Sequence, residues 1–360
     1  MICDHVSEDR DVTSLRKTYE VVKMTFRVGL RRLLYNDTHR CNWNETSPRP
    51  LLTDVWYPAA DAAVESDVFI GPSNMPLFNA GKAARDADMA SGSFPLILLS
   101  HGTGGMSLQL GWLGCHLASQ GYIVSAVNHH GNNALEPYML EGFLRYWERP
   151  KDITALLNQL LVDPDFGARI NRNQIGAAGF SLGGYTALAI AGGVTDIRLL
   201  IETYQNSGRD LSRVIPPEFP NPAAFAEELK SLSQYAPLAD ASYRDERVKS
   251  SFAIAPALGE AFSPEGLSSI EIPVKIIVGE EDQIAPAATN GLYLAKHIKG
   301  AELAILEKVG HYTFLADPTE AGKRELPMLS IDFPGVNRMS IHRMVSNWAQ
   351  EFFDEHLKAN

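Results

Sequence analysis

The strongest constraint on the fold is a regular alternation, from Phe94 onward, of short apolar runs with amphipathic stretches. The runs are apolar throughout rather than at every second residue, as in 94–102 (FPLILLSHG) and 122–131 (YIVSAVNHHG). Strands of this kind are buried on both faces. Leucines at helical spacing follow each run, in 107–121 and 149–164. The alternation therefore predicts an α/β fold, with a mostly parallel sheet and helices on both faces.

The same alternation continues to the C-terminus. Further strands are expected at 174–181, 248–258, 271–282 and 301–311, and helices at 182–193, around 287–298 and near 339–357. The segments 21–32 and 50–60 precede the alternation and predict an antiparallel entry into the sheet.

Two segments depart from the alternation. Residues 61–93, which include the stretch GPSNMPLFNAGKAARDADMASGS, are interpreted as a long surface loop with at most one short helix. Residues 194–247 are interpreted as a mostly helical, cap-like insertion over the C-terminal sheet edge, because Asn221-Pro222 resembles a helix start. It could instead pack outside the sheet without touching any site. We expect residues 1–20 to form an N-terminal extension and 21–360 a single domain.

Composition excludes several classes of protein. Hydrophobic residues make up 45% and charged residues 21%, which excludes a mostly disordered chain. With 32 basic and 43 acidic residues the net charge is −11, and there is no basic stripe, so nucleic acid is not an expected partner. No apolar run approaches the roughly 18 residues of a membrane span, and the N-terminus lacks a signal-peptide pattern. We therefore expect a cytoplasmic protein without a membrane span; the sequence leaves its oligomeric state open.

The sequence predicts neither a metal site nor a cofactor. The three cysteines, Cys3, Cys41 and Cys115, are scattered and fit neither a disulfide framework nor a metal knuckle. Adjacent residues of a strand point to opposite faces, so His129 and His130 could not easily share one ion. The glycines at 102–105 are not followed by the Lys-Ser/Thr pair of a phosphate loop.

The residues that indicate chemistry begin with Gly179-Phe180-Ser181-Leu182-Gly183, the pattern G-x-S-x-G. An apolar run precedes it and an alanine-rich helical stretch follows, the strand–turn–helix setting of a nucleophile elbow. Such a turn requires small residues two before and two after the serine, and both are glycine here. Five-residue patterns also arise by chance, but this context predicts that Ser181 is a nucleophile at a helix N-terminus.

A serine nucleophile needs a base and a group that orients the base. His311 follows the apolar run 301–309 and is late in the chain, in the order serine, acid, histidine. Asp282 follows another apolar run, far enough upstream for a helix and a strand to return to the same sheet edge. Glu280 and Glu281 are competitors for the acid, and Asp282 could merely cap the next helix.

Two backbone amides are expected to stabilise a negative intermediate. One is that of Leu182, directly after the nucleophile. The other is that of Thr103, in the glycine-rich loop 101–105 (HGTGG), although these glycines could serve only a tight turn. The expected substrate pocket involves Gly104, His130, Phe180 and Trp147, although aromatic clusters more often belong to a core.

These residues resemble the α/β-hydrolase superfamily across the chain after residue 20. Within it, the sequence resembles the branch of dienelactone-hydrolase-like esterases and platelet-activating-factor acetylhydrolases, through LLTDVWYPAA, FPLILLSHGTGG, YIVSAVNHHG, WERPKDITALLNQL, GFSLGGYTAL and VGEEDQIAP. The resemblance implies an eight-stranded, mostly parallel sheet. It also implies hydrolysis of carboxylic esters without a cofactor, by Ser181, Asp282 and His311 with the amides of Thr103 and Leu182.

The chain departs from both relatives. Dienelactone hydrolases use a cysteine nucleophile where Ser181 stands. In the acetylhydrolases the acid follows the preceding strand, where this chain has SFAIAPALG without an aspartate, so Asp282 is the expected acid.

A small-molecule ester is thus the expected substrate, cleaved through an acyl-enzyme. Three alternatives remain open. An amidase or peptidase, or an acyltransferase, could use the same three residues, and a non-catalytic binding protein could share the scaffold.

Overall fold

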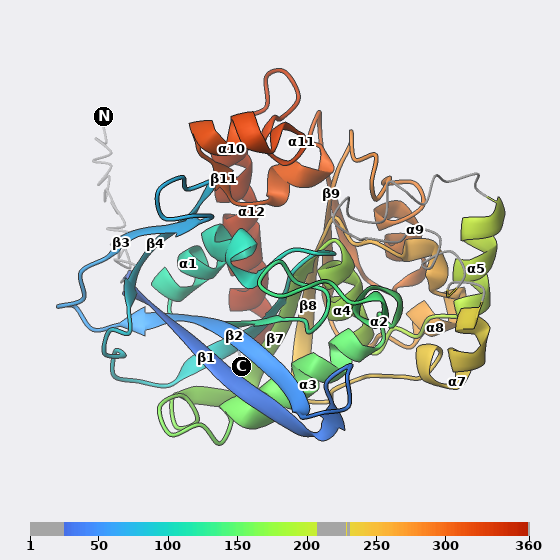
Figure 1. The fold of residues 1–360 in the computed structure, drawn as a ribbon, viewed down its shortest axis with the longest axis horizontal. Helices are drawn as coiled ribbons and strands as arrows, with labels where there is room; N and C mark the ends of the chain where they lie inside the picture. Colours follow the sequence, from blue (N-terminus) through green and yellow to red (C-terminus); the bar gives the residue numbers. More distant parts are fainter. Residues whose placement is uncertain (1–24, 207–227, 229–230, 359–360) are drawn as a thin grey trace, which may run out of the picture.

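The computed structural model describes residues 25–206, 228 and 231–358, and a mixed sheet runs through their centre (Figure 1). Its eleven strands follow the order β10-β9-β8-β7-β5-β6-β2-β1-β4-β11, and β3 pairs with β4. They are β1 (Arg27–Cys41), β2 (Pro48–Ala59), β3 (Ser66–Ile70), β4 (Phe78–Arg85), β5 (Phe94–Ser100), β6 (Ile123–Asn128), β7 (Ile170–Phe180), β8 (Val248–Ile254), β9 (Val274–Gly279), β10 (Glu302–Leu306) and β11 (Asp317–Pro318).

The strands from β10 to β6 are all parallel, as the continuous apolar runs predict. Each is five residues or longer, and β5, β6 and the second half of β7 are buried throughout. β2 pairs antiparallel with β6 and with β1, which confirms the predicted antiparallel entry. The carboxyl ends of β5, β7 and β9 consequently meet at one edge of the sheet, where ligands of such folds bind.

The interpretation of residues 61–93 as a surface loop is wrong. They contain β3 and β4, two strands beyond the eight expected. β4 continues the sheet next to β1, and the short strand β11 pairs with β4 at the sheet edge. β4 buries Phe78, Ala80, Ala83 and Ala84. Its sequence FNAGKAAR is rich in alanine and glycine, which are rare in strands, so propensity concealed a segment that tertiary pairing makes extended.

Helices cover both faces of the sheet. The longer ones are α1 (Gly111–Ser119), α3 (Glu148–Leu160), α4 (Leu182–Ile190), α5 (Ile197–Asn206), α9 (Gly291–His297) and α12 (Arg338–Phe353). Shorter helices and turns are η1 (Ser107–Leu110), α2 (Leu140–Leu144), η3 (Leu232–Tyr235), α7 (Ala236–Ala239), η4 (Gly259–Ala261), α8 (Pro264–Ser268), η5 (His311–Phe314), α10 (Glu320–Glu325), α11 (Pro327–Ser330) and η6 (Asp354–Lys358).

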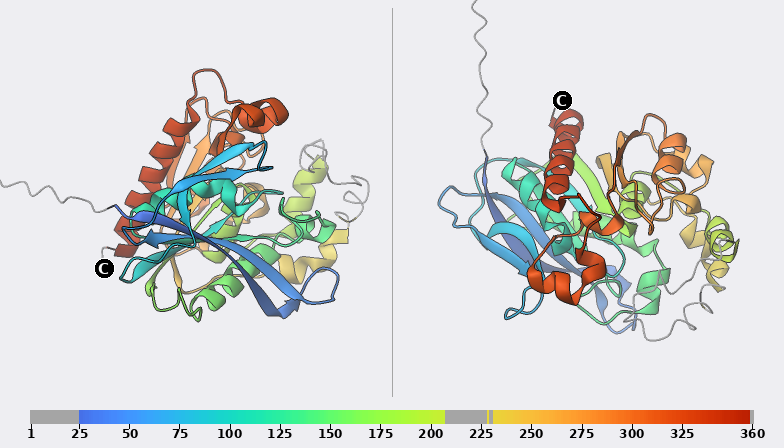
Figure 2. Two further views of the ribbon diagram at one scale, coloured as in Figure 1. Left: turned by 60° about the vertical axis from the view of Figure 1, so that its left-hand side comes forward. Right: turned by 90° about the horizontal axis from the view of Figure 1, so that it is seen from above.

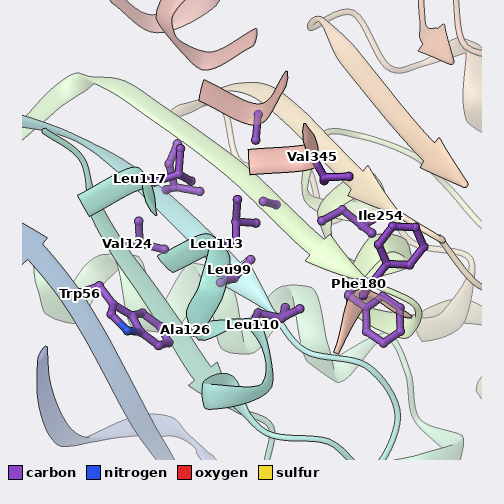
Figure 3. Close-up of a cluster of buried hydrophobic side chains, with 14 of the residues drawn as sticks. Trp56, Leu99, Leu110, Leu113, Leu117, Val124, Ala126, Phe180, Ile254 and Val345 are labelled. Carbon is purple, nitrogen blue, oxygen red and sulfur yellow. The ribbon is translucent and has the colours of Figure 1, made fainter. Parts of the chain in front are cut away.

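Each face of the sheet has its own apolar core. α1 and α12 pack beside each other, and Leu113, Leu117 and Val345 meet Leu99 and Ile254 of the sheet there (Figures 2 and 3). α3, α4 and α9 belong to the clusters of the opposite face. This confirms helices on both faces of the sheet.

Only part of the expected cap is described. α5 begins beside η4, where the Asp196 amide donates to the Ala261 carbonyl at 2.8 Å, and η3 and α7 end the segment. Asn221-Pro222 and residues 1–20 lie outside the described residues, so the cap and the N-terminal extension stay predictions. Among the described helices, none has the length and apolarity to cross a membrane.

Candidate active site

Ser181 occupies a sharp turn between β7 and α4. Its backbone has a positive φ of 55° with ψ −120°, a strained conformation for a residue with a side chain. A Cβ on Gly179 would overlap the Gly183 carbonyl, and a Cβ on Gly183 would overlap the Ser100 carbonyl. Only glycine fits at these two positions, because the turn brings three backbone segments into contact.

The structure brings Ser181, His311 and Asp282 together. His311 Nε2 lies 2.9 Å from Ser181 Oγ, and His311 Nδ1 lies 2.6 Å from Asp282 Oδ2. All three residues are buried, at 4–6% exposure. They follow three different strands, so the convergence depends on the parallel sheet rather than on sequence proximity.

The loop around Asp282 determines which ring nitrogen of His311 carries the proton. Asp282 Oδ1 accepts the backbone N–H groups of Ile284 at 2.9 Å and Ala285 at 2.7 Å. Oδ2 is left to accept from His311 Nδ1, so Nε2 is free to accept from the serine hydroxyl. The aspartate therefore both caps its own turn and orients the imidazole. Glu280 and Glu281, the two competitors, are exposed.

The loop that carries His311 is held by two ring side chains from α1 and α12, which are far apart in the sequence. Trp112 Nε1 donates to the Phe314 carbonyl, and His342 Nε2 donates to the Thr313 carbonyl, both at 2.9 Å. The two rings stack with centroids 4.3 Å apart. Burial lowers the pKa of His342 to about 4, so this imidazole is neutral at pH 7.

The glycine-rich loop lies directly against the serine. A Cβ on Gly102 would stand 3.2 Å from Ser181 Cβ. His101 Nδ1 donates to the Gly102 carbonyl at 2.7 Å, and its Nε2 accepts from the His129 amide at 3.1 Å. Burial, the largest cause, lowers the pKa of His101 well below its usual range, so the ring is neutral and holds the Gly102–Thr103 peptide in one orientation.

The two expected amides remain available. Among the hydrogen bonds of the described residues, none uses the N–H of Thr103 or Leu182. Gly104, by contrast, donates its N–H to Asn132 Oδ1 at 2.6 Å, and its carbonyl accepts from Tyr138 Oη at 2.9 Å. Gly104 has φ +61°, so the turn also needs its glycine for conformational reasons.

Of the other residues expected in the pocket, Phe180 lies beside His311, whereas Trp147 and His130 pack against other aromatic side chains. Phe180 is buried with its ring centroid 4.8 Å from that of His311. Trp147 is fully buried between Tyr146 and Tyr235. His130 stacks on the Trp43 ring, and its Nδ1 pairs with Glu136 at 3.0 Å. His129 faces the other way, towards Asp152, so the two histidines do not share a site.

Sequence reasoning missed a buried polar network beneath the glycine-rich loop. Asp152 binds Arg49 at 2.7 Å, Arg40 at 2.8 Å and His129 Nδ1 at 3.0 Å. The cationic partners, chiefly Arg49, hold the pKa of Asp152 well below its usual range against the effect of burial. Arg149 joins the network from the same helix. A signal was present, because Arg149 and Asp152 share the helix face that carries Ile153 and Leu156.

No group of three or more His, Cys, Asp or Glu side chains that could hold a metal ion is found within the part of the chain that the structure describes.

A parallel sheet with antiparallel entry strands, and a serine, histidine and aspartate at the ends of its strands, define an α/β-hydrolase. A family model described as "Alpha/beta hydrolase family" matches residues 96–321, more than half of the chain, and the chain belongs to this family.

A solved structure, a ferulic acid esterase from Streptomyces cinnamoneus, superposes with a TM-score of 0.63 at 21% identity, over 93% of this chain and 91% of that one. A pimeloyl-[acyl-carrier protein] methyl ester esterase from Neisseria meningitidis is 40% identical over 50 residues, which are 14% of this chain. The match spans only 19% of that curated relative's length.

Proposed function

We propose that this chain is a serine esterase that cleaves small to medium carboxylic esters through an acyl-enzyme. The observation that carries the proposal is the buried series of hydrogen bonds from Asp282 through His311 to Ser181. A buried polar series at a strained turn costs stability, and residues with strained backbones cluster at active sites. Both similar proteins above are named as esterases, which supports ester chemistry.

In the proposed reaction, His311 Nε2 takes the proton of Ser181 Oγ as this oxygen attacks the ester carbonyl carbon. The amides of Thr103 and Leu182 donate to the resulting oxyanion. The imidazolium then gives its proton to the leaving alkoxide as the C–O bond breaks. Water, deprotonated by the same nitrogen, attacks the acyl-enzyme and releases the acid and the free serine.

Within the family, we place the chain with the dienelactone-hydrolase-like esterases and platelet-activating-factor acetylhydrolases, on the motifs quoted above. Serine in place of the dienelactone hydrolases' cysteine favours an open ester over a lactone as the substrate.

The test is hydrolysis of p-nitrophenyl acetate, butyrate and octanoate by wild type, Ser181→Ala and Ser125→Ala. Ser125 is a buried serine of β6 whose hydroxyl has no hydrogen-bond partner among the described residues, so its variant is the matched control. Removing a triad serine costs up to about 10⁶ in kcat. We expect Ser181→Ala to lose at least about 10⁴-fold and Ser125→Ala to keep wild-type kcat. Failure of a fluorophosphonate to label Ser181 would instead indicate a binding protein.

The same assays separate the esterase from its rivals. Matched p-nitroanilides test for an amidase or peptidase, which would show a comparable kcat/KM on the anilide. Added alcohol tests for an acyltransferase, which would form a new ester in place of the free acid. An esterase gives little anilide cleavage and mainly the acid.

A further inference from the structure

Arg149 is a buried charge that the proposed reaction does not use. It lies in the first turn of α3, and 1% of its surface is exposed. Burial, the largest cause, lowers the pKa of Arg149 to about 9, and Asp152 opposes the shift. The guanidinium is therefore charged at pH 7. A buried charge is costly, and Nη1 of this group has no hydrogen-bond partner among the described residues, so the contacts that Nη2 and Nε make are informative.

These contacts join the two backbone segments that carry the proposed oxyanion donors. Arg149 Nη2 donates to the His101 carbonyl, two residues before Thr103, and lies 3.5 Å from Ser100 Oγ. Its Nε donates to Thr186 Oγ1 at 3.3 Å. The Thr186 hydroxyl in turn donates to the Leu182 carbonyl at 2.9 Å. One rigid, planar group thus links the end of β5 to the first turn of α4.

The two segments are in direct contact at this point. A Cβ on Gly183 would overlap the Ser100 carbonyl and lie 2.8 Å from the His101 carbonyl oxygen. No side chain separates the strand end from the helix start, so their relative position depends on packing and on the groups that bind their polar atoms. Ser100 is held from the other side as well, because its Oγ lies 2.9 Å from His129 Nε2.

We propose that Arg149 is a positioning residue for the oxyanion site. It holds the His101 and Leu182 segments at the separation at which the amides of Thr103 and Leu182 converge on one oxygen atom. The inference rests on the proposed esterase function and assigns a role that this function alone does not require. Arg149 acts through the backbone and does not touch the substrate.

Such a role has a specific kinetic signature. A donor that is displaced weakens binding of the oxyanion and leaves binding of the ground-state ester almost unchanged. Losing one oxyanion donor costs about 10²–10³ in kcat, and a displacement of about 1 Å costs up to about 10². A loss of fold alone would reduce the number of active sites and leave each remaining site at its wild-type rate.

The test compares Arg149→Met with Arg49→Met. Arg49 is equally buried and binds the same network through Asp152, but it contacts neither oxyanion segment. Active sites are counted by fluorophosphonate titration. Then kcat, KM with p-nitrophenyl acetate and Ki for an aryl trifluoromethyl ketone, whose adduct carries an oxyanion, are measured per titrated site.

For Arg149→Met we expect kcat to fall about 30–100-fold, KM to stay within threefold, and Ki to rise in parallel with the loss in kcat. Arg49→Met should keep kcat and Ki within about threefold even where its Tm falls. Wild-type kcat and Ki per titrated site in Arg149→Met would overturn the proposal.

Two milder variants test the proposal even if Arg149→Met does not fold. Arg149→Lys keeps the charge but has a single donor nitrogen, and Thr186→Val removes the link to Leu182 with little change of shape. Both should lower kcat about 3–20-fold at constant KM, because each displaces the same two amides by less than Arg149→Met does. Wild-type kcat and Ki in both would overturn the positioning role. Absence of esterase activity and labelling in the wild type would instead overturn the proposed function.

Discussion

The substitution Asp282→Asn tests the orientation of the catalytic histidine. Asp282 Oδ1 accepts the amides of Ile284 and Ala285. In the variant the amide oxygen must stay at this position, because an NH₂ group there would face two N–H donors. The new NH₂ group then takes the place of Oδ2, which lies 2.6 Å from His311 Nδ1 in the wild type. Nδ1 has to become an acceptor, so Nε2 carries the proton and can no longer accept one from Ser181.

The expected loss follows from this change of tautomer. An Asp→Asn change in a Ser-His-Asp triad that leaves the geometry intact lowers kcat about 10⁴-fold. That factor corresponds to about 5.5 kcal/mol of transition-state stabilisation at roughly 1.4 kcal/mol for each tenfold. KM should change by less than about threefold, because Asp282 is buried behind the imidazole. Steady-state hydrolysis of p-nitrophenyl butyrate measures both parameters.

Glu280→Gln and Glu281→Gln are the matched controls, since both carboxylates are exposed and belong to the same loop. Each should keep kcat within about twofold of wild type, as surface substitutions generally change little. The reasoning is refuted if Asp282→Asn keeps more than a tenth of the wild-type kcat, or if either glutamine variant loses activity to the same extent.

Three further predictions concern stability. Leu113→Ala should lower the free energy of unfolding by about 2–5 kcal/mol in urea titrations, because Leu113 is fully buried between α1 and the sheet; a loss below 1 kcal/mol would contradict this packing. Gly183→Ala should lower Tm and kcat together, because the added methyl group meets the Ser100 carbonyl; unchanged values would disprove the contact. Lowering the pH from 7.5 to 5 should cost about 2 kcal/mol through His342, because the unfolded chain takes up its proton near pH 6.5 and the folded chain only near pH 4. His342→Gln, which keeps a donor for Thr313, should remove that share of the pH dependence in urea titrations, and an unchanged slope would contradict it.

The parallel part of the sheet could be predicted because its signals are local. The strands from β5 to β9 each contain a short apolar run that predicts burial on both faces. The run of β10 also predicted a strand, but β10 lies at the sheet edge, where Glu302 and Ile305 are exposed. The signals for Ser181 are local as well, since the glycines around it, the preceding strand and the following helix lie within one stretch of sequence. Asp282 and His311 were predictable in part, from their positions just after apolar runs.

The segments that sequence reasoning missed depend on contacts between distant residues. β4 forms a strand because β1, β3 and β11 pair with it, and its alanines give no local sign of this. The indole of Trp112 and the imidazole of His342 meet at the histidine loop from positions more than two hundred residues apart. No spacing rule relates two such residues.

Arg149 was predictable in part, because its helix face gave a local signal although its contacts are with distant residues. An arginine and an aspartate on the apolar face of a helix conflict with the binary pattern. In α3 the buried charges are offset by the bond from Arg149 to the His101 carbonyl and by the cationic partners of Asp152, although Arg149 Nη1 has no hydrogen-bond partner among the described residues. In a doubly covered sheet, backbone carbonyls are accessible to a helix chiefly at strand ends, which is also where the nucleophile and its loop lie. In this chain the buried Arg149 of α3 accordingly lies at the end of β5, the sheet edge that also carries Ser181.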